Sequence, residues 1–172
     1  MNAIADRRNL PVVGEVTIVA GDAGLRMLAF TGQGDTCIEA PAGVSPLTNV
    51  AFAQVEAYLS GQRQTFDLPV DLRECSTFTL RVLEVCRQIP WGATTTYRGC
   101  AQALGSSGAV RAVGSALGRN PLPIIIPCHR VLATGGLGGY TPGVALKRLL
   151  LTIEGHADDT ASIASAAAIP AN

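Results

Sequence analysis

The sequence predicts a two-domain α+β protein, with an N-terminal α/β module followed by a mainly helical C-terminal domain that contains a helix-turn-helix. Three observations predict this fold class. The apolar period changes at Ser76, from the alternation of residues 66–72 to helical spacing. The net charge changes sign at nearly the same place, and a helix, a glycine-containing turn and a second helix follow. We therefore expect domains at residues 1–75 and 76–155, and a disordered tail over residues 156–172 with little to bury.

The N-terminal module is predicted to contain a hairpin, one helix and a further strand. The run Gly-Asp-Ala-Gly is a strong turn signal between two apolar segments. A serine followed by a proline is typical of a helix start, and glycine of a helix end. No strand is predicted before residue 16. The expected elements are strands over residues 16–20, 25–30 and 66–72, the turn at residues 21–24, and a helix from Ser45 and Pro46 to Gly61.

The C-terminal domain is predicted to be built from four helices. Its second and third helices flank the turn Gly-Ser-Ser-Gly at residues 105–108, which is the helix-turn-helix pattern. Small residues on one face of the later helix allow close approach to another surface, and DNA is the natural candidate. An ordinary helical hairpin packed on a core fits the same pattern. The expected helices cover about residues 78–89, from Thr95 or Thr96 to 104, 109–117, and 144–153.

The charge of the chain is divided between its halves. Residues 1–75 carry five arginines and nine acidic residues, whereas residues 76–155 carry eight basic and two acidic residues. A net charge of zero therefore conceals a basic C-terminal domain, which favours a polyanionic partner. A basic face that is simply solvated is the alternative.

Composition restricts the class of protein. The chain has 172 residues, is 48% hydrophobic, and contains no run of about 20 apolar residues of the kind that spans a membrane. Its five cysteines are odd in number and lack a framework spacing, which favours a reducing compartment over a disulfide scaffold. We expect a cytoplasmic protein without a membrane partner, and we interpret every cysteine except Cys128 as a packing residue.

Cys128 is the candidate nucleophile. It stands in the run Asn-Pro-Leu-Pro-Ile-Ile-Ile-Pro-Cys-His-Arg-Val at residues 120–131, where residues 124–126 predict a short buried strand. The thiolate is the reactive form of cysteine, and charge from His129 and Arg130 can bring its pKa from about 8.5 toward neutrality. A thiol held at the end of a stiff buried segment is suited to nucleophilic chemistry.

Two other interpretations of Cys128 remain open at this point. A cysteine that follows a buried strand is often only a small core residue. Zinc binding is a second alternative, but no further Cys or His pair has ligand spacing, so we predict no metal site. Cys128 and His129 are adjacent in sequence, and the only other histidine is His156. We therefore expect a bridging water, rather than direct contact, to carry a proton between Cys128 and His129.

The motif Pro-Cys-His-Arg-Val at residues 127–131 resembles that of the O6-alkylguanine-DNA alkyltransferases, also called methylated-DNA-protein-cysteine methyltransferases. The resemblance includes Asn-Pro at residues 120–121, Ile-Pro-Trp-Gly at 89–92, and Arg-Ala-Val-Gly at 111–114. It is dense from about residue 78 to residue 155 and looser over the N-terminal module. The glycine run found in many members reads Gly-Tyr-Thr-Pro-Gly here, and Leu83 stands where tryptophan is frequent. The Pro142 substitution leaves the preferred alkyl size open.

The resemblance implies direct reversal of DNA damage. Cys128 accepts the alkyl group of O6-alkylguanine by in-line displacement, and His129 acts as the base through water. Glu154 orients the imidazole, and Asn120 holds the turn around the cysteine. Tyr97 helps to rotate the nucleotide and donates a proton toward the departing base. Because the carbon–sulfur bond of a thioether is not readily cleaved, each chain reacts only once, and the reaction needs no cofactor.

The resemblance also implies a minor-groove DNA interface and a pocket for the flipped base. Arg111 fills the stack where the nucleotide was. The implied partner is double-stranded DNA carrying O6-alkylguanine, bound by a monomer in solution, with O4-alkylthymine and cooperative assembly left open. The implied DNA contacts are Tyr97, Arg111, Ala112, Gly114, Ser115 and Arg130, and the base pocket is formed by Val131, Tyr140 and Thr141.

Two rival functions remain at this stage. Alkyltransferase-like proteins bind the same lesions without transferring anything, but they usually replace the cysteine, which this chain retains. A helix-turn-helix regulator whose thiol senses alkylation or oxidation is the second rival. Steep preference for one operator sequence would distinguish that regulator from a repair protein.

Overall fold

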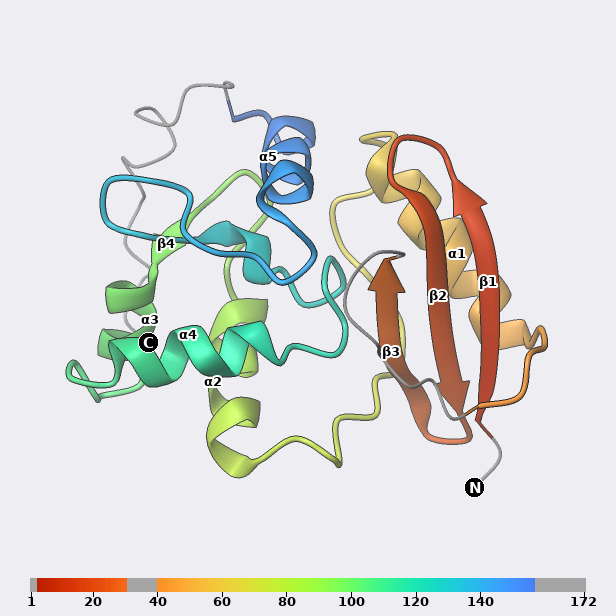
Figure 1. The fold of residues 1–172 in the computed structure, drawn as a ribbon, viewed down its shortest axis with the longest axis horizontal. Coiled ribbons are helices and arrows are strands. Elements are labelled where there is room, and N and C mark those ends of the chain that lie inside the picture. Colours follow the sequence, from red (N-terminus) through yellow and green to blue (C-terminus); the bar gives the residue numbers. More distant parts are fainter. Residues whose placement is uncertain (1–2, 31–39, 157–172) are drawn as a thin grey trace. The chain divides into compact units, whose positions relative to one another are not determined.

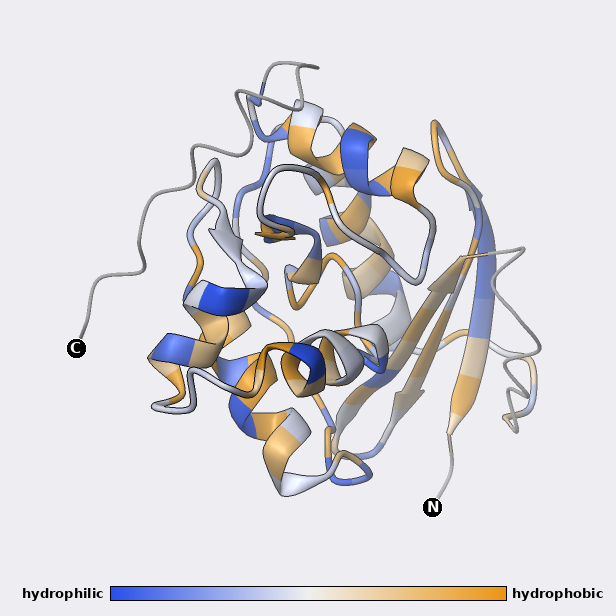
Figure 2. Cartoon of the chain, turned by 60° about the vertical axis from the view of Figure 1, so that its left-hand side comes forward, coloured by the Kyte–Doolittle hydropathy of each residue, from blue (hydrophilic) through white to orange (hydrophobic). Residues whose placement is uncertain are grey.

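The computed structural model describes residues 3–30 and 40–156. The chain forms two compact units. The first comprises Met1–Arg73 together with Pro121–Ile125, and the second comprises Glu74–Asn120 together with Ile126–Asn172. Hydrophobic residues occur in the helices and strands of both units (Figure 2). None of the helices in the described part of the chain is long and apolar enough to cross a membrane.

The first unit is a three-stranded antiparallel sheet with one helix packed on it (Figure 1). The predicted hairpin is confirmed, since Val16 pairs with Phe30 and Gly21 with Gly24. Its core contains fully buried Val16 and Ile18 from the sheet. In chain order the elements are β1 (Ile4–Leu10), β2 (Gly14–Gly21), β3 (Gly24–Phe30) and α1 (Pro46–Leu59).

Two strand predictions in this unit are wrong. Strand β1 was not expected, because a buried aspartate breaks its apolar pattern. Asp6 is 4% exposed, yet its carboxylate accepts hydrogen bonds from Arg8 and from the Thr48 hydroxyl at 2.7 and 2.8 Å. The strand expected over residues 66–72 is reduced to a single bridge between Leu25 and Val70. Asp67 there is held by the side chain of Gln54 rather than by a strand partner.

Helix α1 begins where its sequence signal places it. The Ser45 hydroxyl accepts the backbone N–H of Thr48, and the Thr48 hydroxyl accepts the backbone N–H of Ser45. This reciprocal capping box satisfies two backbone donors. The apolar face then buries Phe52, Val55 and Tyr58 completely.

The β1–β2 turn contains a strained valine, and its replacement should stabilise the protein. Val12 has a φ of 74° and is 73% exposed, so the substitution Val12→Asn removes a β-branched side chain from the left-handed region without opening a cavity. We expect a gain of about 1 kcal/mol in the free energy of unfolding, seen as a rise of about 2–4 °C in the thermal midpoint. Val44→Asn is the matched control, because Val44 is 61% exposed but is not among the residues with positive φ. An equal rise in both variants would contradict the strain argument.

The second unit is helical, which confirms the predicted fold class. Helix α2 is capped by Ser76 and α3 by Thr96, each accepting a backbone N–H three residues on. Strand β4 pairs in parallel with β5, through Thr95 and Val131. The elements are α2 (Thr77–Arg87), β4 (Thr95–Thr96), α3 (Tyr97–Ala103), α4 (Val110–Gly118), the 3₁₀ turn η1 (Cys128–Arg130), β5 (Val131–Leu132) and α5 (Val144–Ile153).

The segment before Cys128 is buried as predicted, but it is not a strand. Ile124 and Ile126 are at most 1% exposed, and Ile124 has a φ of 73°. That conformation interrupts any extended run. Pro121 instead accepts the backbone N–H of Leu28 from β3 at 2.8 Å, so Pro121–Ile125 belongs to the first unit.

Candidate active site

Cys128 is the first residue of the 3₁₀ turn η1, which leads into β5. Pro127 precedes it, and the backbone N–H of Arg130 donates to the carbonyl oxygen of Pro127 at 3.0 Å. The chain then enters β5, whose parallel partner β4 leads directly into Tyr97, the first residue of α3. The pairing of β4 with β5 thus brings Tyr97 toward the cysteine segment.

Asn120 holds both sides of the turn around the cysteine, in agreement with the position expected for it. Its Nδ2 donates to the carbonyl oxygen of Ile126 at 2.9 Å and to Sγ of Cys128 at 3.0 Å. A second donor of the turn is the backbone N–H of Cys128, which bonds the same carbonyl at 2.8 Å. The amide of Asn120 therefore both closes the loop and provides a donor to the sulfur.

The expectation of a lowered thiol pKa is wrong for the protein without DNA. Cys128 is 7% exposed, and burial raises its pKa to about 11, although the hydrogen bond from Asn120 and the charge of Lys147 act in the opposite direction. Desolvation disfavours the thiolate more than these neighbours favour it. Cys128 is thus a thiol at neutral pH, and its proton must leave during the reaction.

Alkylation of Cys128 by iodoacetamide in the absence of DNA should therefore depend on pH differently from that of an ordinary cysteine. The thiolate fraction rises until the pH is about one unit above the pKa, so the rate should still climb at about pH 10, where an ordinary thiol has levelled off. Mass spectrometry of the tryptic peptide covering residues 120–130 isolates this cysteine. A plateau at or below about pH 9.5, as for an ordinary thiol, would contradict the assigned burial effect.

His129 and Glu154 form a buried pair, an arrangement that fits the role which the family resemblance implied for Glu154. Their side chains have no exposed surface, and Nε2 of His129 lies 2.8 Å from Oε1 of Glu154. Neighbouring hydrogen bonds and charges outweigh burial and lower the pKa of Glu154 to about 2, so the carboxylate is ionised and only accepts. Nε2 must then carry the proton, which leaves the lone pair of neutral His129 on Nδ1.

Arg130 does not lie at the surface, so its predicted contact with DNA is wrong. It is 6% exposed, and its guanidinium binds Glu154, with NH2 at 2.8 Å from Oε1 and Nε at 2.9 Å from Oε2. A third guanidinium nitrogen donates to the carbonyl oxygen of Ile89. Basic residues are usually exposed, and the sequence alone gave no sign that this arginine is paired inside the protein.

Lys147 is a site residue that the sequence interpretation missed. It is fully buried, and its Nζ donates to the carbonyl oxygens of Val131 at 2.6 Å and Gly139 at 3.2 Å. Burial lowers its pKa to about 8. The apolar face of α5 was predicted from Leu146, Leu149, Leu150 and Ile153. Of these only Leu150 is buried, together with Lys147 and Leu151.

A cavity of about 160 Å³ is lined in part by Cys128. Tyr97 extends over it, with its hydroxyl donating to the carbonyl oxygen of Gly139 at 3.1 Å, and Nζ of Lys147 lies 5.9 Å from the centre of its ring. Two aromatic side chains and a thiol thus surround a space suited to a flat ligand. The lining residues are Tyr97, Gly114, Leu117, Gly118, Cys128, Gly139, Tyr140 and Thr141.

Of the three predicted base-pocket residues, Tyr140 and Thr141 line the cavity and Val131 does not. The ring of Tyr140 meets that of His129 edge-on, with centroids 6.4 Å apart. Thr141 is exposed, and its hydroxyl donates to the carbonyl oxygen of Gly118 at 2.9 Å. Val131 is buried with its carbonyl oxygen bound to Lys147, so it supports the wall rather than forming it.

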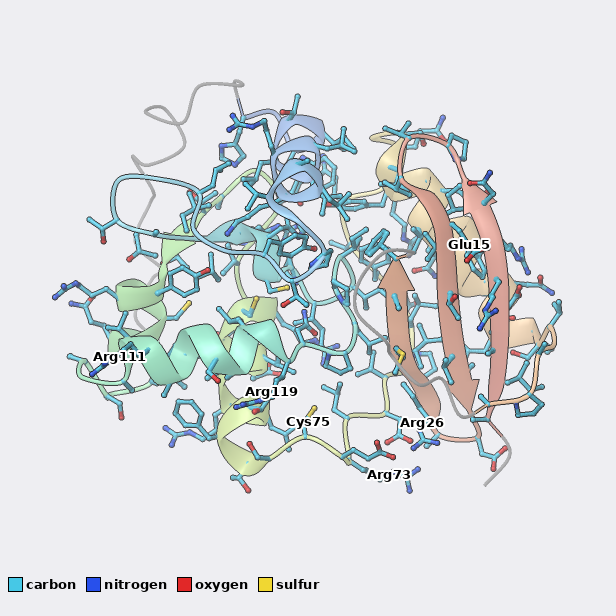
Figure 3. All side chains as sticks on the ribbon, viewed as in Figure 1. Glu15, Arg26, Arg73, Cys75, Arg111 and Arg119 are labelled. Carbon is cyan, nitrogen blue, oxygen red and sulfur yellow. The ribbon has the colours of Figure 1, made fainter. Side chains whose placement is uncertain are left out.

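The exposed face of α4 holds the remaining predicted DNA contacts. Arg111, Ala112 and Ser115 are exposed, and Arg119 follows the helix and donates to the Ser115 hydroxyl at 3.1 Å (Figure 3). Gly114 lies between this face and the cavity, where a Cβ would stand 3.8 Å from the ring of Tyr97. The face offers two cations and small side chains beside the opening of the cavity.

Comparison with known proteins now identifies the family. Residues 77–156 match the family model described as 6-O-methylguanine DNA methyltransferase, DNA binding domain, and residues 9–72 match its ribonuclease-like domain. A methylated-DNA–protein-cysteine methyltransferase of Metallosphaera sedula is 41% identical over 143 residues, covering 83% of this chain and 87% of that protein. The chain belongs to the O6-methylguanine DNA methyltransferase family.

Solved structures of the O6-methylguanine DNA methyltransferase family agree with this assignment. Mycobacterium tuberculosis OGT, in a crystal structure with DNA, has 35% sequence identity and a TM-score of 0.78, covering 94% of this chain and 98% of that chain. The Pyrococcus kodakaraensis methyltransferase, at 24% identity and a TM-score of 0.66, supports the fold alone. The predicted family membership is confirmed, together with the enzyme class that it implied.

Proposed function

We propose that this chain repairs double-stranded DNA by transferring the alkyl group of O6-alkylguanine to Cys128. The observation that carries the proposal is the placement of a buried thiol at a cavity lined by Tyr97 and Tyr140, with the His129–Glu154 pair next to it. The DNA complex of its Mycobacterium tuberculosis relative supports DNA as the partner.

The burial of Cys128 supports a mechanism in which the damaged nucleotide leaves the duplex. Cys128 is 7% exposed and lines the cavity, so an O6 atom inside stacked DNA would not reach it. Flipping a nucleotide costs a few kcal/mol. The small exposed residues of α4 would lie against the minor groove, where Arg111 would fill the vacated stack. The α3–turn–α4 segment would then act as the helix-turn-helix.

The proposed chemical step conserves atoms and charge. Cys128 loses its proton through a water molecule to Nδ1 of His129, and the bond from Sγ to the alkyl carbon forms as the bond from that carbon to O6 breaks. The Tyr97 hydroxyl donates a proton to the departing guanine and recovers one from His129 through solvent. The products are a thioether and an unmodified guanine.

This chemistry implies one alkyl group per polypeptide and no cofactor. A thioether offers no leaving group that water could displace at neutral pH, so the protein cannot regenerate its thiol. We further propose that it acts as a monomer in the cytoplasm, where the four free cysteines of the described residues stay reduced.

An equimolar reaction tests the proposal. The protein is mixed with duplex DNA containing one O6-methylguanine, digested with trypsin, and the peptide over residues 120–130 is weighed. We expect it to gain the mass of one methyl group, with a plateau at one per chain, and no gain with undamaged duplex. Tight binding without any gain would indicate an alkyltransferase-like protein, and selective binding to one undamaged sequence would indicate a regulator.

A further inference from the structure

The carboxylate of Glu154 is shared between two cationic or potentially cationic partners. Oε1 accepts from Nε2 of His129 at 2.8 Å and from NH2 of Arg130 at 2.8 Å. Oε2 accepts from Nε of Arg130 at 2.9 Å and from the backbone N–H of Gly92 at 3.3 Å. The guanidinium therefore bridges both oxygens, whereas His129 holds one of them.

The charge of this buried cluster depends on the protonation of His129. With neutral His129, the opposite charges of Arg130 and Glu154 cancel. Protonation would leave one net positive charge among side chains that are at most 7% exposed, which desolvation opposes. If Arg130 were absent, Glu154 would face His129 alone, and protonation would instead create a neutral pair.

We propose that Arg130 is a positioning residue which neutralises Glu154 and thereby keeps His129 uncharged and able to accept a proton at neutral pH. The inference rests on the proposed function only for the use of that proton acceptor. It gives Arg130 a role in place of the DNA contact, which its burial excludes.

The other groups that face His129 support the assignment. Glu154 alone favours the imidazolium, while Arg130 from η1 and Lys147 from α5 oppose it. Cys128 adjoins it in the chain, and Tyr140 from the following loop presents an aromatic ring. Burial is the largest of these effects, and the pKa of His129 lies below its ordinary value.

Histidine titration by NMR tests the proposal on the full chain without DNA. The sequence contains two histidines, so His156→Gln assigns both signals. We expect His129 to stay neutral below the pH at which an ordinary histidine titrates. In Arg130→Met, a side chain of similar length without charge, its midpoint should rise markedly, whereas Arg130→Lys, which keeps the charge, should remain near wild type. An unchanged midpoint in Arg130→Met would overturn the proposal.

The rate of methyl transfer provides the second measurement. Because protonated His129 cannot accept a proton, the acid limb of the pH–rate profile should move to higher pH in Arg130→Met. We expect a loss of about tenfold or more at pH 7 that is largely recovered at alkaline pH. A loss that is equal at every pH would indicate a purely structural role and overturn the inference.

A second variant tests the proposal if the first one does not fold. If Arg130→Met does not fold, Glu154→Gln gives the reciprocal measurement, in which His129 faces only the charges of Arg130 and Lys147 and should become harder to protonate. A midpoint that instead rises would refute the shared-carboxylate argument. The titration needs no substrate, so a shifted midpoint in a protein that transfers no methyl group would contradict the proposed function and leave this inference standing.

Discussion

Replacing Cys128 with serine is expected to abolish methyl transfer altogether while leaving the fold and DNA binding in place. A serine hydroxyl is far less nucleophilic than a thiol toward saturated carbon and has no neighbouring base strong enough to ionise it. Serine is slightly smaller than cysteine, and Asn120 can donate to its oxygen as it does to Sγ. The measurement is the mass of the full chain after an hour with equimolar O6-methylguanine duplex, alongside binding to the same DNA.

Cys75→Ser is the matched control for this prediction. Cys75 is half-buried and does not line the cavity. We expect the Cys75→Ser variant to accept one methyl group at the wild-type rate. Methyl transfer to the Cys128→Ser chain, at any residue, would show that the acceptor has been assigned wrongly.

Lys147→Met should lower the rate of methyl transfer by about tenfold or more. Among the charged neighbours of Cys128, Lys147 is the one that favours the thiolate, and an opposite charge nearby lowers a thiol pKa by a unit or more. Methionine occupies a similar volume but carries no charge. The single-turnover rate with O6-methylguanine duplex measures the effect, and wild-type rates in the variant would contradict it.

Loss of the charge can be separated from movement of the loop. Lys147 also donates to the carbonyl oxygens of Val131 and Gly139, so its removal could displace the cavity wall. A charge effect moves the iodoacetamide profile of Cys128 to higher pH, whereas displacement of the wall changes the rate equally at every pH. Arg148→Met, the next residue on α5, controls for removal of a cation from this helix.

Local signals predicted the helices well. Ser45, Ser76 and Thr96 cap α1, α2 and α3 because their hydroxyls satisfy backbone donors that the helix itself cannot. These interactions involve residues three apart, so they can be inferred directly from the sequence. The hairpin of β2 and β3 depends on the local run of turn residues in the same way.

Two of the errors involve partners that are distant in sequence, and a third concerns Lys147. Strand β1 was missed because one of the hydrogen-bond donors that satisfy the buried Asp6 is Thr48, 42 residues away. Arg130 was assigned to the surface because Glu154, its partner, lies 24 residues further on. Lys147 was counted only toward the net charge of residues 76–155, although residues 147, 150, 151 and 154 share the buried face of α5 and its end. A lysine on the same helix face as buried leucines was the signal that could have revealed the burial of Lys147.

The backbone N–H of Leu28 donates to the carbonyl oxygen of Pro121, and residues 121–125 belong to the first unit. That unit is therefore discontinuous along the chain. During translation the ribosome completes β3 long before it produces Pro121. The N–H of Leu28 therefore lacks this acceptor while α2, α3 and α4 are synthesised. A fragment that stops at Arg73 would lack this acceptor. Exchanging N-terminal halves between relatives must therefore carry residues 121–125 along with residues 1–73.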